Sequence, residues 1–172
     1  MITNFLTAYI AVRADEGGND DDPHDHGGRT SRGITQREYD AWCHLTGRPG
    51  GDVWEASEED IQAIYHGQYW QPWCDNLPLG PDYVFFDMCV NEGQLQAAKN
   101  LQRALKVKVD GHVGVITLSA AQKADPAKLV GRMCALNRTF YKGLKQFHRY
   151  GRGWLNRVDH VERTALKMVN KG

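Results

Sequence analysis

Hydrophobic residues recur every three or four positions over most of the chain. This spacing is typical of helices that bury one face. It predicts helices over residues 3–14, 35–46, 57–69, 82–90, 94–105, 126–147 and 154–169, with a break at residues 91–93 and a further short helix capped by Thr117. No segment of strand length alternates between apolar and polar residues. The pattern therefore predicts a mainly α-helical fold.

Capping residues support several of these boundaries. Thr35 and Glu38 have the spacing of a capping box, and Ser57 precedes three acidic residues, as is typical of a helix start. Asp125 followed by proline predicts the start of a long basic helix. Gly151 and Gly153 are expected to interrupt that helix, so that a separate last helix begins at Trp154.

Composition bounds the architecture and leaves one question open. A chain of 172 residues with 41% hydrophobic content fits one domain, or one domain with a small appendage. The net charge is zero, but residues 123–172 hold 12 Lys and Arg against 3 acids. These charges either form two solvated faces that attract one another, or make a basic surface that meets a polyanion.

The cysteines and the N-terminus indicate the compartment. Cys43, Cys74, Cys89 and Cys134 form no C-x-x-C pair, so we expect reduced thiols that pack as small hydrophobic side chains. The N-terminus lacks the basic region of a signal peptide, and no apolar run is long enough to span a membrane. We expect synthesis in the cytoplasm.

The segment from Glu16 to Thr35 is rich in acids and glycines. Its glycines and Pro23 disfavour a helix, and its run of three Asp leaves no apolar face for a buried strand. We therefore expect a polar loop between the first two helices. Glu16 lies at the end of the first helix, where the helix dipole raises the pKa of a carboxyl group and so favours a general acid.

Several motifs in the chain resemble those of the glycoside hydrolase 108 muramidases, which include phage endolysins and bacterial lysozyme-like proteins. The N-terminal motif consists of Glu16-Gly17-Gly18, Asp25-His26-Gly27-Gly28-Arg29-Thr30 and Gly33-Ile34-Thr35. Residues 86–91, 101–105, 109–114 and 153–158 are similar to the family's peptidoglycan-binding-type half. The resemblance implies a lysozyme-like helical fold with an irregular acidic catalytic loop between the first two helices. Residues 1–90 would be the catalytic part, and residues 91–172 a helical peptidoglycan-binding-type part of the same globule.

The resemblance makes Glu16 the catalytic acid. Hydrolysis of the β-1,4 bond between N-acetylmuramic acid and N-acetylglucosamine needs a proton donor and a second group that places water or stabilises positive charge. We expect Asp25 to be that second group, with Asp22 as the alternative and as a substrate contact, and Thr30 to help hold the water. Asp25 and Thr30 also suit purely structural turn contacts. The nine-residue gap from Glu16 to Asp25 and the resemblance in fold favour inversion of the anomeric configuration, which the carboxylate separation would decide.

Two tryptophans and an asparagine are expected to contact substrate. Trp70 and Trp73 flank Pro72 in a predicted connection, where two such rings are hard to bury together, so we expect both to contact glycan. Asn91 resembles a family position near the cleft, although capping of a helix explains it equally well. Residues 20–26 lack the pattern of a calcium loop, and we expect no metal and no cofactor.

The expected partner is the glycan strand of peptidoglycan. Residues 128–149 carry their basic residues among core positions, so we expect contact with peptidoglycan carboxylates or anionic outer-membrane lipid rather than nucleic acid. We expect a monomeric phage endolysin that acts in the periplasm after release by a separate pore or secretion system. The alternatives are a non-catalytic wall-binding module, a chitinase or chitosanase, a lytic transglycosylase, and a helical protein that binds metal or nucleic acid.

Overall fold

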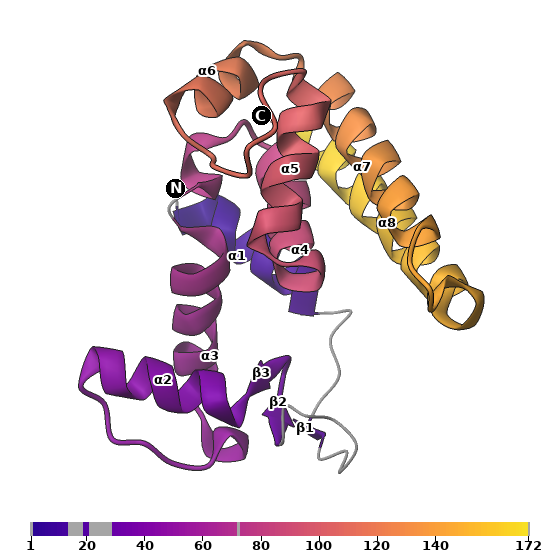
Figure 1. Cartoon of the computed structure of the whole chain (residues 1–172). Coiled ribbons are helices and arrows are strands. Elements are labelled where there is room, and N and C mark those ends of the chain that lie inside the picture. Colours follow the sequence, from indigo (N-terminus) through magenta and orange to yellow (C-terminus); the bar gives the residue numbers. More distant parts are fainter. Residues whose placement is uncertain (1, 14–18, 21–28, 72, 172) are drawn as a thin grey trace. The chain divides into compact units, whose positions relative to one another are not determined.

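The computed structural model describes residues 2–13, 19–20, 29–71 and 73–171, which belong to two compact units (Figure 1). The first unit comprises Leu6–Gln68, and the second combines Met1–Phe5 with Tyr69–Gly172. The predicted division after residue 90 into a catalytic and a peptidoglycan-binding-type part concerned function, and it stays a prediction.

The described residues are mainly helical, as the sequence predicts. The α-helices are α1 (Ile2–Arg13), α2 (Gln36–Thr46), α3 (Glu58–Tyr65), α4 (Pro81–Glu92), α5 (Gln94–Leu105), α6 (Val115–Lys123), α7 (Pro126–Lys142) and α8 (Phe147–Val169). Helix α3 continues into a π-helical turn, His66–Trp70, and two short 3₁₀ turns cover Val53–Glu55 and Cys74–Asn76. None of the helices in the described part of the chain is long and apolar enough to cross a membrane.

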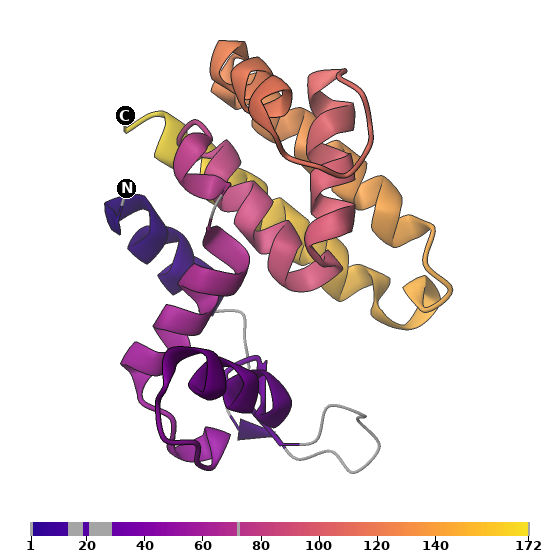
Figure 2. The ribbon, with the colours of Figure 1, turned by 60° about the vertical axis from the view of Figure 1, so that its left-hand side comes forward.

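Helix α4 is the centre of the second unit. All nine residues from Pro81 to Cys89 are buried, and α5, α7 and α8 pack against this helix (Figures 1 and 2). Helices α7 and α8 lie side by side and run in opposite directions. At the start of α1, the ring of Phe5 meets those of Trp70 and Phe86 edge-on, with centroids 5.5 and 6.0 Å away. The continuous burial explains why this segment is mostly apolar around the helix, with Asp82 and Asp87 as its two buried acids.

The capping residues mark the helix starts that the sequence indicates. Thr35 and Glu38 form both hydrogen bonds of the capping box at the start of α2, and Ser57 and Asp125 cap α3 and α7. One expected cap is wrong: α6 begins at Val115 after Gly114, and Thr117 is buried inside its first turn.

The predicted interruption at Gly151 and Gly153 is also wrong, because α8 runs through both residues. Gly151 is buried against the ring of Phe147 one turn earlier, and a Cβ atom at Gly151 would lie 2.6 Å from that ring. The glycine therefore allows a close contact within the helix rather than ending it. The break between α7 and α8 lies before these glycines, between Lys142 and Phe147.

The loop between α1 and α2 carries a small antiparallel sheet that the sequence did not indicate. Strand β1 (Asn19–Asp20) pairs with β2 (Thr30–Ser31), which pairs with β3 (Ile34–Thr35). Arg32 and Gly33 connect β2 to β3 with φ angles of 52° and 81°. Positive φ at both central residues is the geometry of a type I′ hairpin turn. Strands of two residues are too short to show alternation, which is why the pattern missed them.

The four cysteines are buried and form no disulfide. Burial raises the pKa values of Cys74 and Cys89, so these thiols stay protonated at neutral pH. This agrees with the predicted role of small hydrophobic side chains.

Candidate functional site

The predicted catalytic acids fall where the structure gives no description. Glu16, Asp22 and Asp25 lie outside the described residues, so their roles stay predictions. Thr30 belongs to the first unit, and Trp70, Trp73 and Asn91 belong to the second.

In the first unit, the turn after Thr30 is fixed by side chains from two helices. Tyr9 on α1 donates a hydrogen bond to Glu58 on α3, with 2.5 Å between the oxygens. The guanidinium of Arg32 pairs with the other oxygen of Glu58 at 3.1 Å and also donates to the main-chain oxygen of Ala56. Tyr65 donates its hydroxyl proton to the main-chain oxygen of Arg32 at 3.0 Å. These contacts hold the left-handed backbone of Arg32 and, with it, the orientation of the β2–β3 hairpin.

The pKa values in this cluster favour an ionised Glu58, which forms an ion pair with Arg32. Burial by itself raises the pKa of Glu58, but hydrogen bonds from Tyr9 and Arg32 outweigh it, so the pKa lies below its usual value. Burial and the hydrogen bond to Glu58 raise the pKa of Tyr9. Glu58 is therefore ionised and Tyr9 protonated at neutral pH. The cluster has the chemistry of a support for the hairpin rather than of a proton donor to substrate.

Trp54 is an exposed aromatic residue that the sequence analysis did not select. Its indole nitrogen donates to the main-chain oxygen of Thr30 at 3.2 Å, and 37% of the residue is exposed. The guanidinium of Arg29 lies 4.5 Å from the centre of its ring and also pairs with Asp52. Trp54 thus places an aromatic surface beside a predicted site residue. The one sequence signal for it is a large aromatic side chain in a polar connection, two residues after Asp52.

The expectation that Trp70 and Trp73 are both accessible is wrong for Trp70. Its ring is fully buried between Phe5 and Phe86, and its indole nitrogen donates to Asp75 at 2.8 Å. The π-helical turn before it carries the ring into the core. Trp73 is half-buried and lines a pocket of about 180 Å³ in the second unit. Of the two tryptophans, only Trp73 is partly accessible.

Asn91 lies exposed near the end of α4 and is oriented by a buried ion pair. Its amide nitrogen donates to the main-chain oxygen of Asp87 at 2.7 Å and approaches the Asp87 carboxylate at 3.3 Å. Arg157 on α8 binds that same carboxylate oxygen through two nitrogens, at 3.0 and 2.9 Å. The Asp87 side chain is only 2% exposed. With its amide nitrogen engaged, Asn91 can present its amide oxygen to a donor on a ligand.

Glu92 is a second carboxyl group that the sequence analysis did not select. Burial, and next to it the charge of Asp87, raises the pKa of Glu92 to about 8. One carboxyl oxygen accepts a hydrogen bond from Asn100 at 3.2 Å, and the other is enclosed without a partner among the described residues. Glu92 is therefore protonated at neutral pH. The unpaired oxygen is enclosed and so is not exposed on the surface of the unit.

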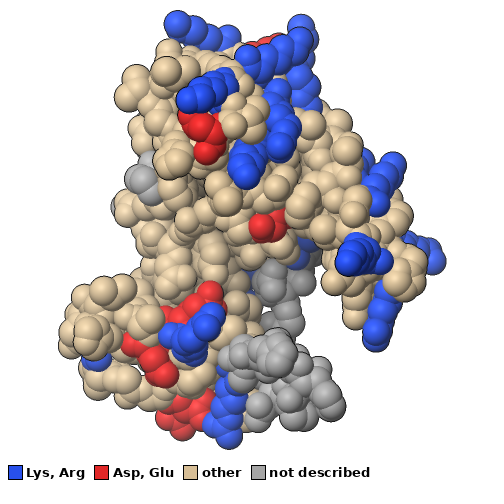
Figure 3. Space-filling view, in the orientation of Figure 1, with Lys and Arg blue, Asp and Glu red and all other residues tan. Residues whose placement is uncertain are grey.

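The two units carry opposite charge. Residues 6–68 contain 5 Lys and Arg and 13 Asp and Glu, whereas the second unit contains 16 Lys and Arg and 8 Asp and Glu. On the face drawn in Figure 3, basic side chains occur over much of the second unit. No group of three or more potential metal ligands occurs among the residues that the structure describes.

The comparisons with known proteins find two family models, which match successive parts of the chain, and a similar solved structure. Residues 9–93 match the family model described as Glycosyl hydrolase 108, and residues 96–159 match the one described as Predicted Peptidoglycan domain. The solved structure of SagA from Brucella abortus is 33% identical in sequence, with a TM-score of 0.84, and the match covers 98% of this chain and 97% of that one. A search of curated proteins gives no match.

Proposed function

Because the chain belongs to the glycosyl hydrolase 108 family, we propose that it is an N-acetylmuramidase, which hydrolyses the β-1,4 bond between N-acetylmuramic acid and N-acetylglucosamine. The family and the peptidoglycan domain that follows it support a glycoside hydrolase that acts on peptidoglycan. The observation that carries the proposal is the family match over residues 9–93, which includes the whole acidic loop.

In this proposal Glu16 donates the proton to the leaving oxygen. It follows α1 by three residues, and the negative end of a helix dipole favours a protonated carboxyl group nearby. Asp25, or Asp22 in its place, activates the attacking water, and Thr30 helps to hold that water. The cluster of Tyr9, Glu58 and Arg32 supports this role for Thr30, because a hairpin fixed in advance loses less entropy when substrate binds. We expect inversion of the anomeric configuration.

The proposed substrate contacts differ between the units. In the first unit we add Trp54 to Asp22, because its exposed ring lies beside Thr30 and aromatic faces stack on sugar rings. In the second unit we retain Trp73 and Asn91. We assign the buried Trp70 a role in the hydrophobic core and no contact with substrate.

We also propose a phage endolysin that works as a monomer on the bacterial cell wall in the periplasm. Residues 126–158 contain 8 Lys and Arg and no Asp or Glu. Such a segment attracts anionic groups, and we expect contact with wall carboxylates or anionic outer-membrane lipid rather than nucleic acid. No cofactor enters the proposed reaction.

The test is Glu16→Gln, assayed by the release of reducing ends from purified sacculi. The substitution keeps the size of the side chain but removes the proton, so we expect activity to fall by about 10³-fold with unchanged thermal unfolding. Glu59→Gln, an exposed acid on α3, serves as the matched control and should keep full activity. Near-normal activity of Glu16→Gln would contradict the proposal.

Mass spectrometry of the digest then identifies the bond and the reaction. N-acetylmuramic acid at the new reducing end is the expected result. N-acetylglucosamine at that end would indicate a different glycosidase, and a 1,6-anhydro product would indicate a lytic transglycosylase.

A further inference from the structure

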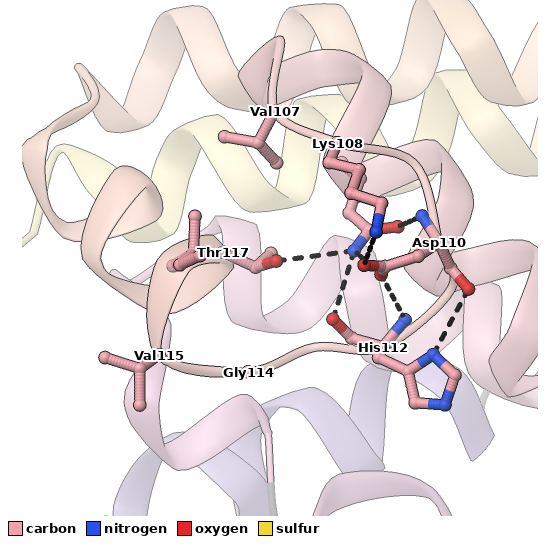
Figure 4. A pocket seen from close by; sticks show the side chains of 9 residues that line it. Val107, Lys108, Asp110, His112, Gly114, Val115 and Thr117 are labelled. Carbon is pink, nitrogen blue, oxygen red and sulfur yellow. Dashed lines mark hydrogen bonds and ion pairs between the residues drawn. The ribbon is translucent and has the colours of Figure 1, made fainter.

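A pocket of about 390 Å³ lies in the second unit, outside every residue assigned to the reaction. The end of α5, the connection that follows it and the first turn of α6 form its walls (Figure 4). Its lining combines β-branched apolar side chains with an acid, a base and an imidazole. The lining residues on which the argument depends are Gln102, Lys108, Asp110, His112, Val115 and Ile116.

Gln102 gives this pocket a fixed frame. The residue is only 1% exposed, and its amide oxygen accepts hydrogen bonds from the main-chain nitrogens of Asp110 and Gly111, at 3.0 and 2.8 Å. Its amide nitrogen donates to the Asp110 carboxylate at 2.8 Å and to the main-chain oxygen of His112 at 3.0 Å. Gly111 has a φ angle of 79°, and a Cβ atom there would lie 2.5 Å from Leu95. A connection held in this way is preorganised for a ligand.

The charged groups of the pocket have opposite sign. Hydrogen bonds from the main chain of His112 and from Gln102 lower the pKa of Asp110, so its carboxylate is ionised. Its second oxygen lies 3.9 Å from the ammonium of Lys108, whose side chain is 87% exposed. The ring nitrogen Nδ1 of His112 lies 3.2 Å from the main-chain oxygen of Asp110, which leaves Nε2 for another partner. Figure 4 shows these groups together at one side of the pocket.

The other side of the pocket is apolar and open. Val115 and Ile116, the first two residues of α6, are 84% and 77% exposed. Exposed Val and Ile side chains next to a rigid pocket gain free energy when a ligand covers them with methyl groups. None of the lining residues is Trp, Tyr or Phe, the side chains on which sugar rings stack.

We propose that this pocket binds the peptide stem of peptidoglycan, an inference that rests on the proposed function. A stem of alanine, D-glutamate, meso-diaminopimelate and D-alanine carries methyl groups, free carboxylates and one free amine. The methyl groups can pack on Val115 and Ile116, a carboxylate can pair with the ammonium of Lys108, and the amine can pair with the carboxylate of Asp110. The pocket lies within the residues that match the peptidoglycan domain. The stem is thus held at a site separate from the reacting glycan.

The first test titrates the full chain with the N-acetylated tetrapeptide, which has one free amine as the wall-bound stem has, and monitors the NMR amide signals of residues 107–117. Titration to roughly 5 mM detects a dissociation constant near 1 mM. We expect shifts confined to this segment, about tenfold weaker binding in Ile116→Ser and about threefold weaker binding in Lys108→Gln. Both side chains are exposed, so neither variant disturbs the core. Lys123→Gln, at the exposed end of α6, is the matched control.

The second test compares intact sacculi with glycan strands from which an amidase has removed the peptides. The double variant Lys108→Gln with Ile116→Ser should raise KM on intact sacculi and leave it unchanged on bare glycan. Normal glycan cleavage without shifts at residues 107–117 would overturn this inference and leave the muramidase intact. Peptide binding without new reducing ends would instead refute the muramidase. Equal binding of chitotetraose at the same amides would show a glycan site and overturn the inference.

Discussion

The two units fix their exposed connections by different means. In the first unit, the hairpin after Thr30 depends on charged contacts at the surface, since the Glu58 side chain that anchors Arg32 is 57% exposed. In the second, the connection after α5 depends on Gln102, which is 1% exposed, and the end of α4 depends on the pair of Asp87 and Arg157, whose side chains are 2% and 16% exposed. Exposed charges are screened by solvent, whereas a buried polar group that loses its partner is costly.

This difference follows the charge of each unit. The first unit concentrates 13 acids in 63 residues, and repulsion among so many like charges is weakest where solvent screens them. The second unit surrounds α4 with helices and so can bury its polar anchors. We therefore expect substitutions of anchors to cost stability in the second unit and mainly activity in the first.

The largest effect is expected for Arg157→Met, which leaves the buried carboxylate of Asp87 without its cation. Removal of one partner from a buried ion pair costs about 3–5 kcal/mol of unfolding free energy. Urea unfolding measures this loss, and Arg163→Met, an exposed residue of the same helix, is the matched control. A loss below about 1 kcal/mol would mean that the buried ion pair of the second unit contributes no more to stability than the exposed pair of the first.

The next effect concerns pH and Glu92, whose pKa rises from 4.5 when unfolded to about 8 when folded. Between these values the folded state holds a proton that the unfolded state has released. The contribution of Glu92 to stability is therefore most favourable below about pH 4.5, and it declines as the pH rises towards 8, by on the order of 1 kcal/mol per pH unit. Glu92→Gln should flatten this part of the profile, as measured by urea unfolding from pH 5 to 8. An unchanged slope would mean that Glu92 is ionised in the folded protein.

A smaller effect separates the two glycines of α8. Gly151→Ala adds a methyl group 2.6 Å from the Phe147 ring, and overpacking of this kind costs about 1–3 kcal/mol. Gly153→Ala meets open space in the same helix and should stabilise it by about 0.5–1 kcal/mol. Thermal unfolding of both variants measures the contrast. Two stabilising substitutions would mean that Phe147 moves aside without cost.

These glycines also show what the sequence could predict. Helix starts with a local chemical cause, such as the Thr35 capping box and Asp125 before Pro126, were predicted from the sequence alone. Gly151 was misjudged because its reason is a packing contact, and Trp70 because its burial depends on rings from α1 and α4. Propensity and spacing carry no information on such contacts.

The candidate site shows the same limit. The acidic loop, Thr30 and Asn91 were selected through motifs, and their roles stay predictions. Trp54 and Glu92 were missed, because their interest comes from an exposed ring beside Thr30 and from burial beside Asp87. Both properties arise only when distant segments meet.

The smallest stability effect is expected in the first unit, for Glu58→Gln. The pair with Arg32 is exposed to solvent, so its loss costs only about 0.5–1 kcal/mol after screening. Activity on sacculi should nevertheless fall about tenfold, because the hairpin that carries Thr30 is less well fixed. Glu59→Gln changes the neighbouring acid, which is exposed on the same helix, and should leave both quantities unchanged. Glu58→Gln could instead destabilise the protein as much as Arg157→Met and leave activity unchanged. That result would contradict the view that solvent exposure makes the polar contacts of the first unit matter less for stability.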